Sequence, residues 1–249
     1  MPRCRREWSG GGCAMATMCL LHGNWHDGSC WEPLARRLER LGHRALTPDL
    51  PLHDPAAGYA ERARPAIEAL ASAEPPVVVV GHSLAAGIAP IVAAGTGATI
   101  VVYLCPAPTG PFAGVDVEMA PVRRTFSLPP TDEHGASVWD AEVAVETMYA
   151  RLPRDIALAV AEQLRPGSSA PDRYQPGRHP DLPGRLILAT EDEFFDPEWS
   201  RRVASAVLAT EPIEITAGHF PMLERPAELA RLLDGVTHIA GATPRSDAS

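Results

Sequence analysis

The sequence predicts an α/β fold built around a mostly parallel β-sheet. Short β-rich runs alternate with longer helical patterns along most of the 249 residues, and such alternation is typical of a parallel sheet with helices on both faces. The run Val77–Val80 is four consecutive β-branched residues, the pattern of a strand that is buried on both sides. In such a fold the functional groups are expected at the carboxyl ends of the strands.

The predicted strands are short apolar runs bounded by Gly, Pro or charged residues. In chain order they are Met18–Leu21, Arg44–Thr47, Val77–Val80, Thr99–Leu104, Arg185–Ala189 and Pro212–Thr216.

The predicted helices are segments with apolar residues every three or four positions, as in Leu34, Leu38 and Leu41. In chain order they are Trp31–Leu41, Tyr59–Ala71, Leu84–Ala94, Trp139–Leu152, Asp155–Leu164, Pro197–Val207 and Ala227–Leu233.

The alternation is interrupted in the middle of the chain, which predicts an inserted domain. We assign 15–106 and 183–235 to the α/β core. Residues 107–182 are assigned to a helical cap, inserted after the strand Thr99–Leu104 that follows the helix Leu84–Ala94. Residues 236–249 are rich in Ala, Thr, Ser and Asp and are expected to form a disordered tail. Residues 1–14 are interpreted as a disordered extension, or as the result of an upstream start in place of Met15 or Met18.

Composition excludes several classes of protein. Hydrophobic residues make up 45% and charged residues 21%, ordinary values for a globular domain. The formal net charge of −9 argues against nucleic-acid binding, which needs clustered Lys and Arg. No apolar run reaches the length of about 18 residues that a membrane span needs. Five cysteines without CxxC spacing favour a cytoplasmic protein with free thiols.

The sharpest motif is Gly81-His82-Ser83-Leu84-Ala85, directly after the predicted central strand. A serine between a strand and a helix, with small residues two positions away on each side, is typical of a nucleophile elbow. The small neighbours are needed because the turn holds the serine in strained backbone geometry. The alternative is that Ser83 only caps the helix, but the strand before it favours the nucleophile.

A histidine and three carboxylates follow in the chain order expected for such a fold, which is serine, acid, histidine. His219 lies between the last predicted strand and the last helix, where it could reach Ser83. His82 is expected to point away from the nucleophile. The candidate acids Glu191, Asp192 and Asp196 all follow the strand that ends at Ala189.

The segment 22–26, His-Gly-Asn-Trp-His, follows the first predicted strand. In folds with a nucleophile elbow, one oxyanion donor is the backbone N–H after the nucleophile, here that of Leu84, and the other comes from the loop after an early strand. We expect the N–H of Asn24 to be this second donor. The sequence has no Gly-rich phosphate loop, metal-ligand cluster or dinucleotide fingerprint, so neither a cofactor nor a metal is expected.

With these motifs in place, the chain resembles the α/β-hydrolase superfamily. Within it, segment 22–26 together with Cys30-Trp31 resembles the methylesterase and hydroxynitrile lyase group, which carries a comparable His-Gly-x-x-His…Trp opening. The segments 41–44, Leu-Gly-His-Arg, and 47–50, Thr-Pro-Asp-Leu, match that group too. The resemblance covers residues 17–105 and 185–234 and leaves the cap without a matching motif. It implies the same two oxyanion donors.

The resemblance also implies a Ser83, Asp192 and His219 triad. In related chains the acid lies in a G-x-x-D pattern, and this chain has Ala189 in place of the Gly, which makes Asp192 the first choice. Cyanohydrin lyases of the group place a Lys directly after the active-site His, where this chain has Phe220. Because an apolar neighbour cannot stabilise cyanide, the sequence argues against that activity.

These expectations describe a serine hydrolase that cleaves a small, largely apolar ester, or transfers its acyl group, through an acyl-enzyme. The alternatives are a lyase, cyclase or isomerase on the same scaffold, or a small-molecule receptor with a vestigial triad. Partners other than a small-molecule substrate are not expected, although the sequence is compatible with a homodimer. The expected pocket residues are Trp25, Phe194, Phe195 and Phe220 on loops beside the triad, and Trp139 and Met148 in the cap.

Overall fold

The computed structural model describes residues 15–115, 126–171 and 177–241, and the predicted extension 1–14 lies outside this range. One six-stranded sheet has the order β2-β1-β3-β4-β7-β8, and every neighbouring pair is parallel. This confirms the predicted fold class. The strands are β1 (Thr17–Leu21), β2 (Arg44–Leu46), β3 (Val77–His82), β4 (Ile100–Leu104), β7 (Gly184–Ala189) and β8 (Ile213–Ile215).

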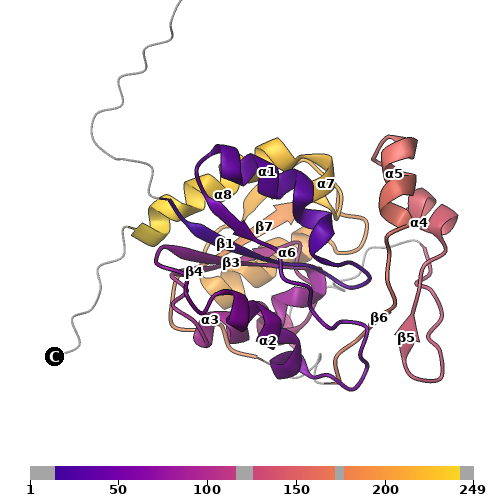
Figure 1. Ribbon diagram of the computed structural model, residues 1–249, viewed down its shortest axis with the longest axis horizontal. Helices are drawn as coiled ribbons and strands as arrows, with labels where there is room; N and C mark the ends of the chain where they lie inside the picture. Colours follow the sequence, from indigo (N-terminus) through magenta and orange to yellow (C-terminus); the bar gives the residue numbers. More distant parts are fainter. Residues whose placement is uncertain (1–14, 116–125, 172–176, 242–249) are drawn as a thin grey trace, which may run out of the picture.

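Helices cover both faces of this sheet (Figure 1). One face carries η1 (Gly28–Trp31), α1 (Glu32–Arg40), α7 (Pro221–Glu224) and α8 (Pro226–Gly241). The other carries α2 (Tyr59–Ala69), η2 (Ser83–Ala86), α3 (Ala89–Ala94), α6 (Pro197–Val203) and η4 (Ala204–Leu208). None of the helices in the described ranges is long and apolar enough to cross a bilayer.

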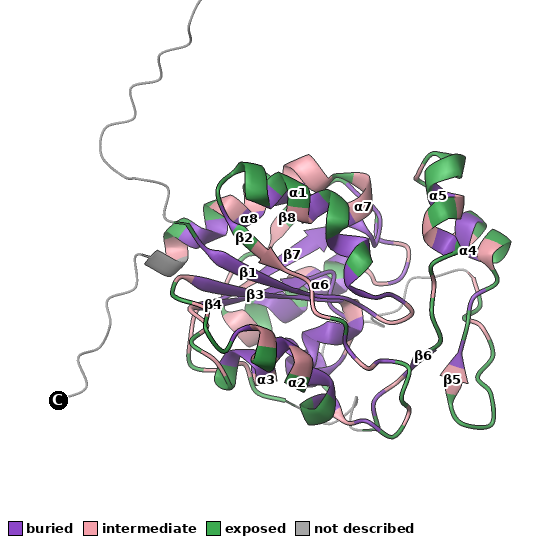
Figure 2. Ribbon diagram, viewed as in Figure 1, coloured by how far each residue is buried: buried purple, intermediate pink, exposed green. Residues whose placement is uncertain are grey.

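The central strands are buried on both faces because their alternate residues enter two separate cores. In β3, Val78 and Val80 pack with α1 and α8, whereas Val77 and Val79 pack with α2 and α3. All six residues of β3 are buried, as Figure 2 shows for the middle of the sheet. A strand without polar alternation is therefore held between two apolar layers, as the run of valines predicts.

The described part of segment 107–182, which the sequence predicts to be a cap, contains two short helices and a small two-stranded sheet that lie beside one end of the main sheet (Figure 1). Its elements are η3 (Gly110–Phe112), β5 (Ala136–Ser137), α4 (Ala141–Thr147), α5 (Arg154–Ala161) and β6 (Gly167–Ser168), with β5 antiparallel to β6. The fully buried Arg62 of α2 joins cap and core, because its guanidinium donates to Ser168 O and Ser168 Oγ, both at 3.0 Å.

The helix predicted at Leu84–Ala94 is in fact two. The short η2 ends at Ala86, and α3 begins only at Ala89. Pro90 explains the break, because proline has no N–H to donate to the carbonyl of Ala86, yet fits the first turn of a new helix.

The last helix is longer than the sequence predicted, and a disordered tail beginning at residue 236 is wrong for residues 236–241. Helix α8 passes through Gly235 and ends at Gly241, and residues 242–249 lie outside the described range. Val236 is buried and continues the apolar stripe of Leu229 and Leu233 at helical spacing. Burial of this stripe outweighs the weak helix propensity of a single glycine.

Because Gly235 is exposed in the middle of a helix, Gly235→Ala is expected to raise the free energy of unfolding by about 1 kcal/mol. A Cβ at this position would meet no atom within 4 Å. Gly42→Ala is the matched control, since its surroundings are equally open but its φ is +94°, a left-handed conformation that favours glycine. Urea denaturation should show the first variant stabilised and the second destabilised. Loss of stability in Gly235→Ala would contradict a helix that continues through this position.

Candidate active site

Ser83 lies at the sharp turn between β3 and η2. Its φ is +53°, an uncommon conformation for a residue with a side chain and one that marks local strain. The following η2 begins at Ser83 itself, so the N–H groups of this first turn have no acceptor within the helix. The turn therefore presents both a hydroxyl and backbone donors at the carboxyl end of the central strand.

Two glycines make room for this turn. A Cβ on Gly81 would lie 2.7 Å from Ala85 O and 2.8 Å from Ala89 Cβ, and a Cβ on Gly23 would lie 3.0 Å from Ser83 Cβ. Both positions are therefore closed to larger residues. The small residue two positions before the serine therefore has a direct steric cause in the structure.

His219 and Asp192 come together at the same edge of the sheet. Residue 219 follows β8 and precedes α7, and residue 192 follows β7. Nδ1 of His219 is 2.8 Å from Oδ2 of Asp192, and both side chains are buried. A carboxylate can only accept, so the proton lies on Nδ1 and Nε2 is left as an acceptor. This is the tautomer that a general base needs.

The two other carboxylates in this loop are engaged elsewhere. Glu191 is half-exposed and forms an ion pair with Arg151 of the cap. Asp196 accepts from the backbone N–H of Glu198 at 2.8 Å and thereby caps α6. Of the three candidates, only Asp192 contacts the imidazole of His219 among the described residues.

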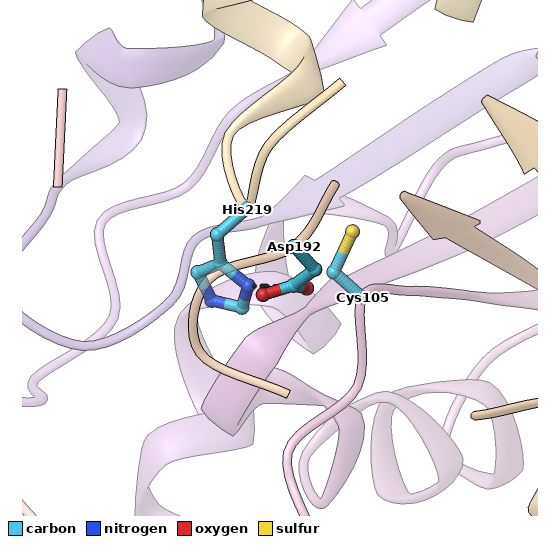
Figure 3. Close-up of side chains that lie close together, drawn as sticks. All are labelled: Cys105, Asp192 and His219. Carbon is cyan, nitrogen blue, oxygen red and sulfur yellow. Dashed lines mark hydrogen bonds and ion pairs between the residues drawn. The ribbon is translucent and has the colours of Figure 1, made fainter. Parts of the chain in front are cut away.

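The Asp192 carboxylate is held rigidly. Its Oδ1 accepts from the backbone N–H groups of Phe194 and Phe195 at 2.8 and 3.0 Å, which leaves Oδ2 for His219. Figure 3 shows Asp192 between His219 and Cys105. The atoms with which these three side chains could bind a metal ion lie within 4.8 Å of one another. Burial, followed by the charge of Asp192, raises the pKa of the Cys105 thiol. A protonated thiol is a poor metal ligand.

The loop after β1 faces the elbow. His22 is buried and accepts from the backbone N–H of Leu50 through Nε2 at 2.9 Å, so its proton lies on Nδ1. Nδ1 lies 3.0 Å from Gly23 O. This histidine fixes the start of the segment that carries Asn24. Both Asn24 and Leu84 line the same pocket as Ser83.

The side chain of His82 contacts His219 and also lines the pocket beside Ser83. Its Nε2 donates to the backbone carbonyl of His219 at 2.8 Å, and the two rings are 4.8 Å apart. Burial is the largest cause that lowers the pKa of His82 well below its usual value. No local pattern predicts this contact, because residues 82 and 219 are far apart in the chain.

Ser83 and His219 line one pocket of about 300 Å³. No Asp, Glu, Lys or Arg occurs among its described lining residues. The polar members are Asn24, His82, Ser83, Thr109, Ser169 and His219, and the apolar members are Trp25, Leu84, Ala107, Pro108, Leu128, Phe194, Phe195 and Phe220.

Four of the six predicted pocket residues line this pocket, namely Trp25, Phe194, Phe195 and Phe220. The predictions for Trp139 and Met148 are wrong, because both side chains are buried in the core between cap and sheet and are absent from the lining. An apolar side chain in this segment can fill a core as well as line a pocket. Five lining residues had no sequence signal, namely Ala107, Pro108, Thr109, Leu128 and Ser169.

Comparisons with known proteins agree with this architecture. Residues 20–232 match the alpha/beta hydrolase family. The structure of the pyrethroid hydrolase PytH has a TM-score of 0.71 and 21% identity, covering 92% of this chain and 100% of that chain. The methylesterase MES16 from Arabidopsis has a TM-score of 0.69 and 16% identity, covering 91% and 100%. At these identities the likeness shows a shared fold.

One curated relative matches over a short segment. A carbendazim hydrolyzing esterase from Nocardioides sp. (strain SG-4G) is 50% identical over 34 residues. The alignment spans 14% of this chain and 14% of that relative, so it carries no statement about the whole protein.

Proposed function

The chain belongs to the alpha/beta hydrolase family, and from this premise we propose that it is a serine esterase with Ser83, His219 and Asp192 as its catalytic triad. The observation that carries the proposal is the pairing of His219 with Asp192 beside the pocket that Ser83 also lines. The substrate is a small, largely apolar ester, whose acyl group is passed to water or to another acceptor.

In the proposed reaction, Nε2 of His219 takes the proton of Ser83 as Oγ attacks the ester carbonyl. The tetrahedral oxyanion is stabilised by the backbone N–H groups of Asn24 and Leu84, each contributing about 3–4 kcal/mol. His219 then protonates the departing alcohol, and Asp192 stabilises the imidazolium throughout. A water molecule, activated by the same histidine, releases the acid and regenerates Ser83.

The lining of the pocket supports a neutral, apolar substrate. Rings of Phe194, Phe195 and Phe220 lie 4.5–5.4 Å from the ring of His219, so the reacting centre is surrounded by apolar surface. The lack of charged residues in the described lining gives a carboxylate or phosphate no counter-ion. The names of two structural neighbours, a pyrethroid hydrolase and a methylesterase, support ester-like substrates.

A fluorophosphonate probe read by intact-protein mass spectrometry tests this function. We expect one adduct per chain, located on Ser83 by peptide mapping, together with hydrolysis of p-nitrophenyl butyrate. Ser83→Ala should lose both the adduct and the hydrolysis. Ser169→Ala, which removes the other serine of the pocket, should keep the adduct. An adduct on another residue, or undiminished hydrolysis in Ser83→Ala, would reject the proposal.

A further inference from the structure

The loop that carries Asn24 is held by the cap as well as by the core. We define residues 22–26 as the oxyanion loop. The indole Nε1 of Trp25 donates to Ser137 Oγ at 3.1 Å, and the backbone N–H of Arg165 donates to Trp25 O at 2.9 Å. On the other side, Nε2 of His26 lies 2.7 Å from the hydroxyl of Tyr149. These three contacts come from different parts of the cap, close to β5, β6 and α4.

The direction of the hydrogen bonds at His26 follows from its partners. Nδ1 is 2.8 Å from the backbone carbonyl of Asn24, which can only accept, so Nδ1 carries the proton. Nε2 is then an acceptor, and Tyr149 must donate its O–H to it. Burial lowers the pKa of His26 to about 4, so the ring is neutral at neutral pH. A directed chain therefore runs from Tyr149 through His26 to the backbone of Asn24.

The backbone at this point needs such support. Trp25, between Asn24 and His26, has a φ of +64°, a conformation that is unfavourable for a bulky residue and persists only when neighbouring contacts impose it. The strand β6 of the cap also approaches closely: a Cβ on Gly167 would lie 2.4 Å from Asn24 Oδ1 and 2.8 Å from Trp25 Cδ1. The oxyanion loop is thus confined on the side facing the cap.

We propose that Tyr149 is a positioning residue for the reaction, which holds the backbone of Asn24 through His26 so that the Asn24 N–H faces the oxyanion. The inference rests on the proposed esterase function. Neither Tyr149 nor His26 is among the described residues that line the pocket, so the effect is exerted on the oxyanion loop and not on the substrate. The cap, in this view, completes the oxyanion hole as well as covering the pocket.

Tyr149→Phe removes only the hydroxyl and tests the proposal. We expect kcat for p-nitrophenyl butyrate to fall about tenfold with KM changed less than about twofold, because a displaced donor costs less than the 10²–10³ of a deleted one. Inhibition by an alkyl trifluoromethyl ketone should weaken in parallel. Addition of Ser83 Oγ to that ketone transfers the serine proton to His219 and places the carbonyl electron pair on an oxyanion in the same hole.

Tyr103→Phe is the matched control. Tyr103 is also buried, and its hydroxyl makes a 2.8 Å hydrogen bond to His179 Nδ1 away from the pocket. The two variants lose the same kind of contact, so a general effect of losing a buried Tyr–His hydrogen bond would lower kcat in both. Only Tyr149→Phe is expected to do so.

Gly167→Ala is a second, independent variant, because the introduced methyl group would press on the Asn24 side chain from the cap side. This variant should also lower kcat more than it raises KM. Unchanged kcat in Tyr149→Phe, or a rise in KM alone, would overturn the proposal while leaving the triad in place. Hydrolysis that survives Ser83→Ala would instead overturn the proposed function itself.

Discussion

Asp192→Asn is expected to lower kcat for ester hydrolysis by about 10⁴-fold while leaving the fold intact. In the native protein the carboxylate accepts the Nδ1 proton of His219 at 2.8 Å. In the variant, the amide oxygen still accepts from the backbone N–H groups of Phe194 and Phe195. The NH₂ group of the amide therefore faces His219. The imidazole then keeps its proton on Nε2, where it cannot accept the proton of Ser83.

The two neighbouring carboxylates provide the controls. Glu191→Gln and Asp196→Asn change the same kind of group in the same loop, but these side chains bind Arg151 and the N-terminus of α6. Their kcat is expected to stay within about threefold of the native value, as for substitutions that leave transition-state contacts unchanged. Steady-state kinetics with p-nitrophenyl butyrate, supported by thermal unfolding of each variant, makes the comparison. A larger loss of kcat in Glu191→Gln than in Asp192→Asn would contradict the assignment of Asp192 as the acid of the triad.

Much of the fold could be predicted because its signals are local. The buried valines of β3, the small residues around Ser83 and the positions of His219 and Asp192 after strands are all visible in short segments. A parallel sheet brings the carboxyl ends of its strands to one edge, so residues after β3, β7 and β8 converge without further information.

The parts that could not be predicted depend on contacts between distant segments. The apolar side chains of Trp139 and Met148 fit a core as well as a pocket, and only the packing of segment 107–182 on the sheet decides between them. The hydrogen bond between His26 and Tyr149 joins residues 123 positions apart. Gly235 illustrates the opposite case, where a local helix-breaking signal is overridden by burial of Val236.

We expect the free energy of unfolding to fall in mild acid, because three buried histidines resist protonation in the folded protein. Burial is the largest cause that lowers the pKa values of His22, His26 and His82, and for His26 the value falls to about 4. An unfolded chain protonates histidine near pH 6.5, so between pH 6.5 and 4 the unfolded state binds more protons than the folded state. Stability therefore rises with pH in this window and is lost as the pH falls.

For His26 alone, the free energy of unfolding is expected to decrease by about 2 kcal/mol from pH 7 to pH 5, and His22 and His82 add losses of the same sign. Glu193 acts in the opposite direction, because burial raises the pKa of its carboxyl and protonation then favours the folded state. Its titration therefore opposes the histidine effect. Urea denaturation at a series of pH values measures the sum.

His26→Gln isolates one term of this pH dependence. A glutamine at position 26 does not titrate, so the slope of the unfolding free energy against pH should become shallower between pH 7 and 5, whatever the absolute stability of the variant. The difference between the two slopes gives the share of His26 directly. Equal slopes in the two proteins would mean that His26 binds protons equally in the folded and unfolded states, which its buried position near His22 and His219 makes costly.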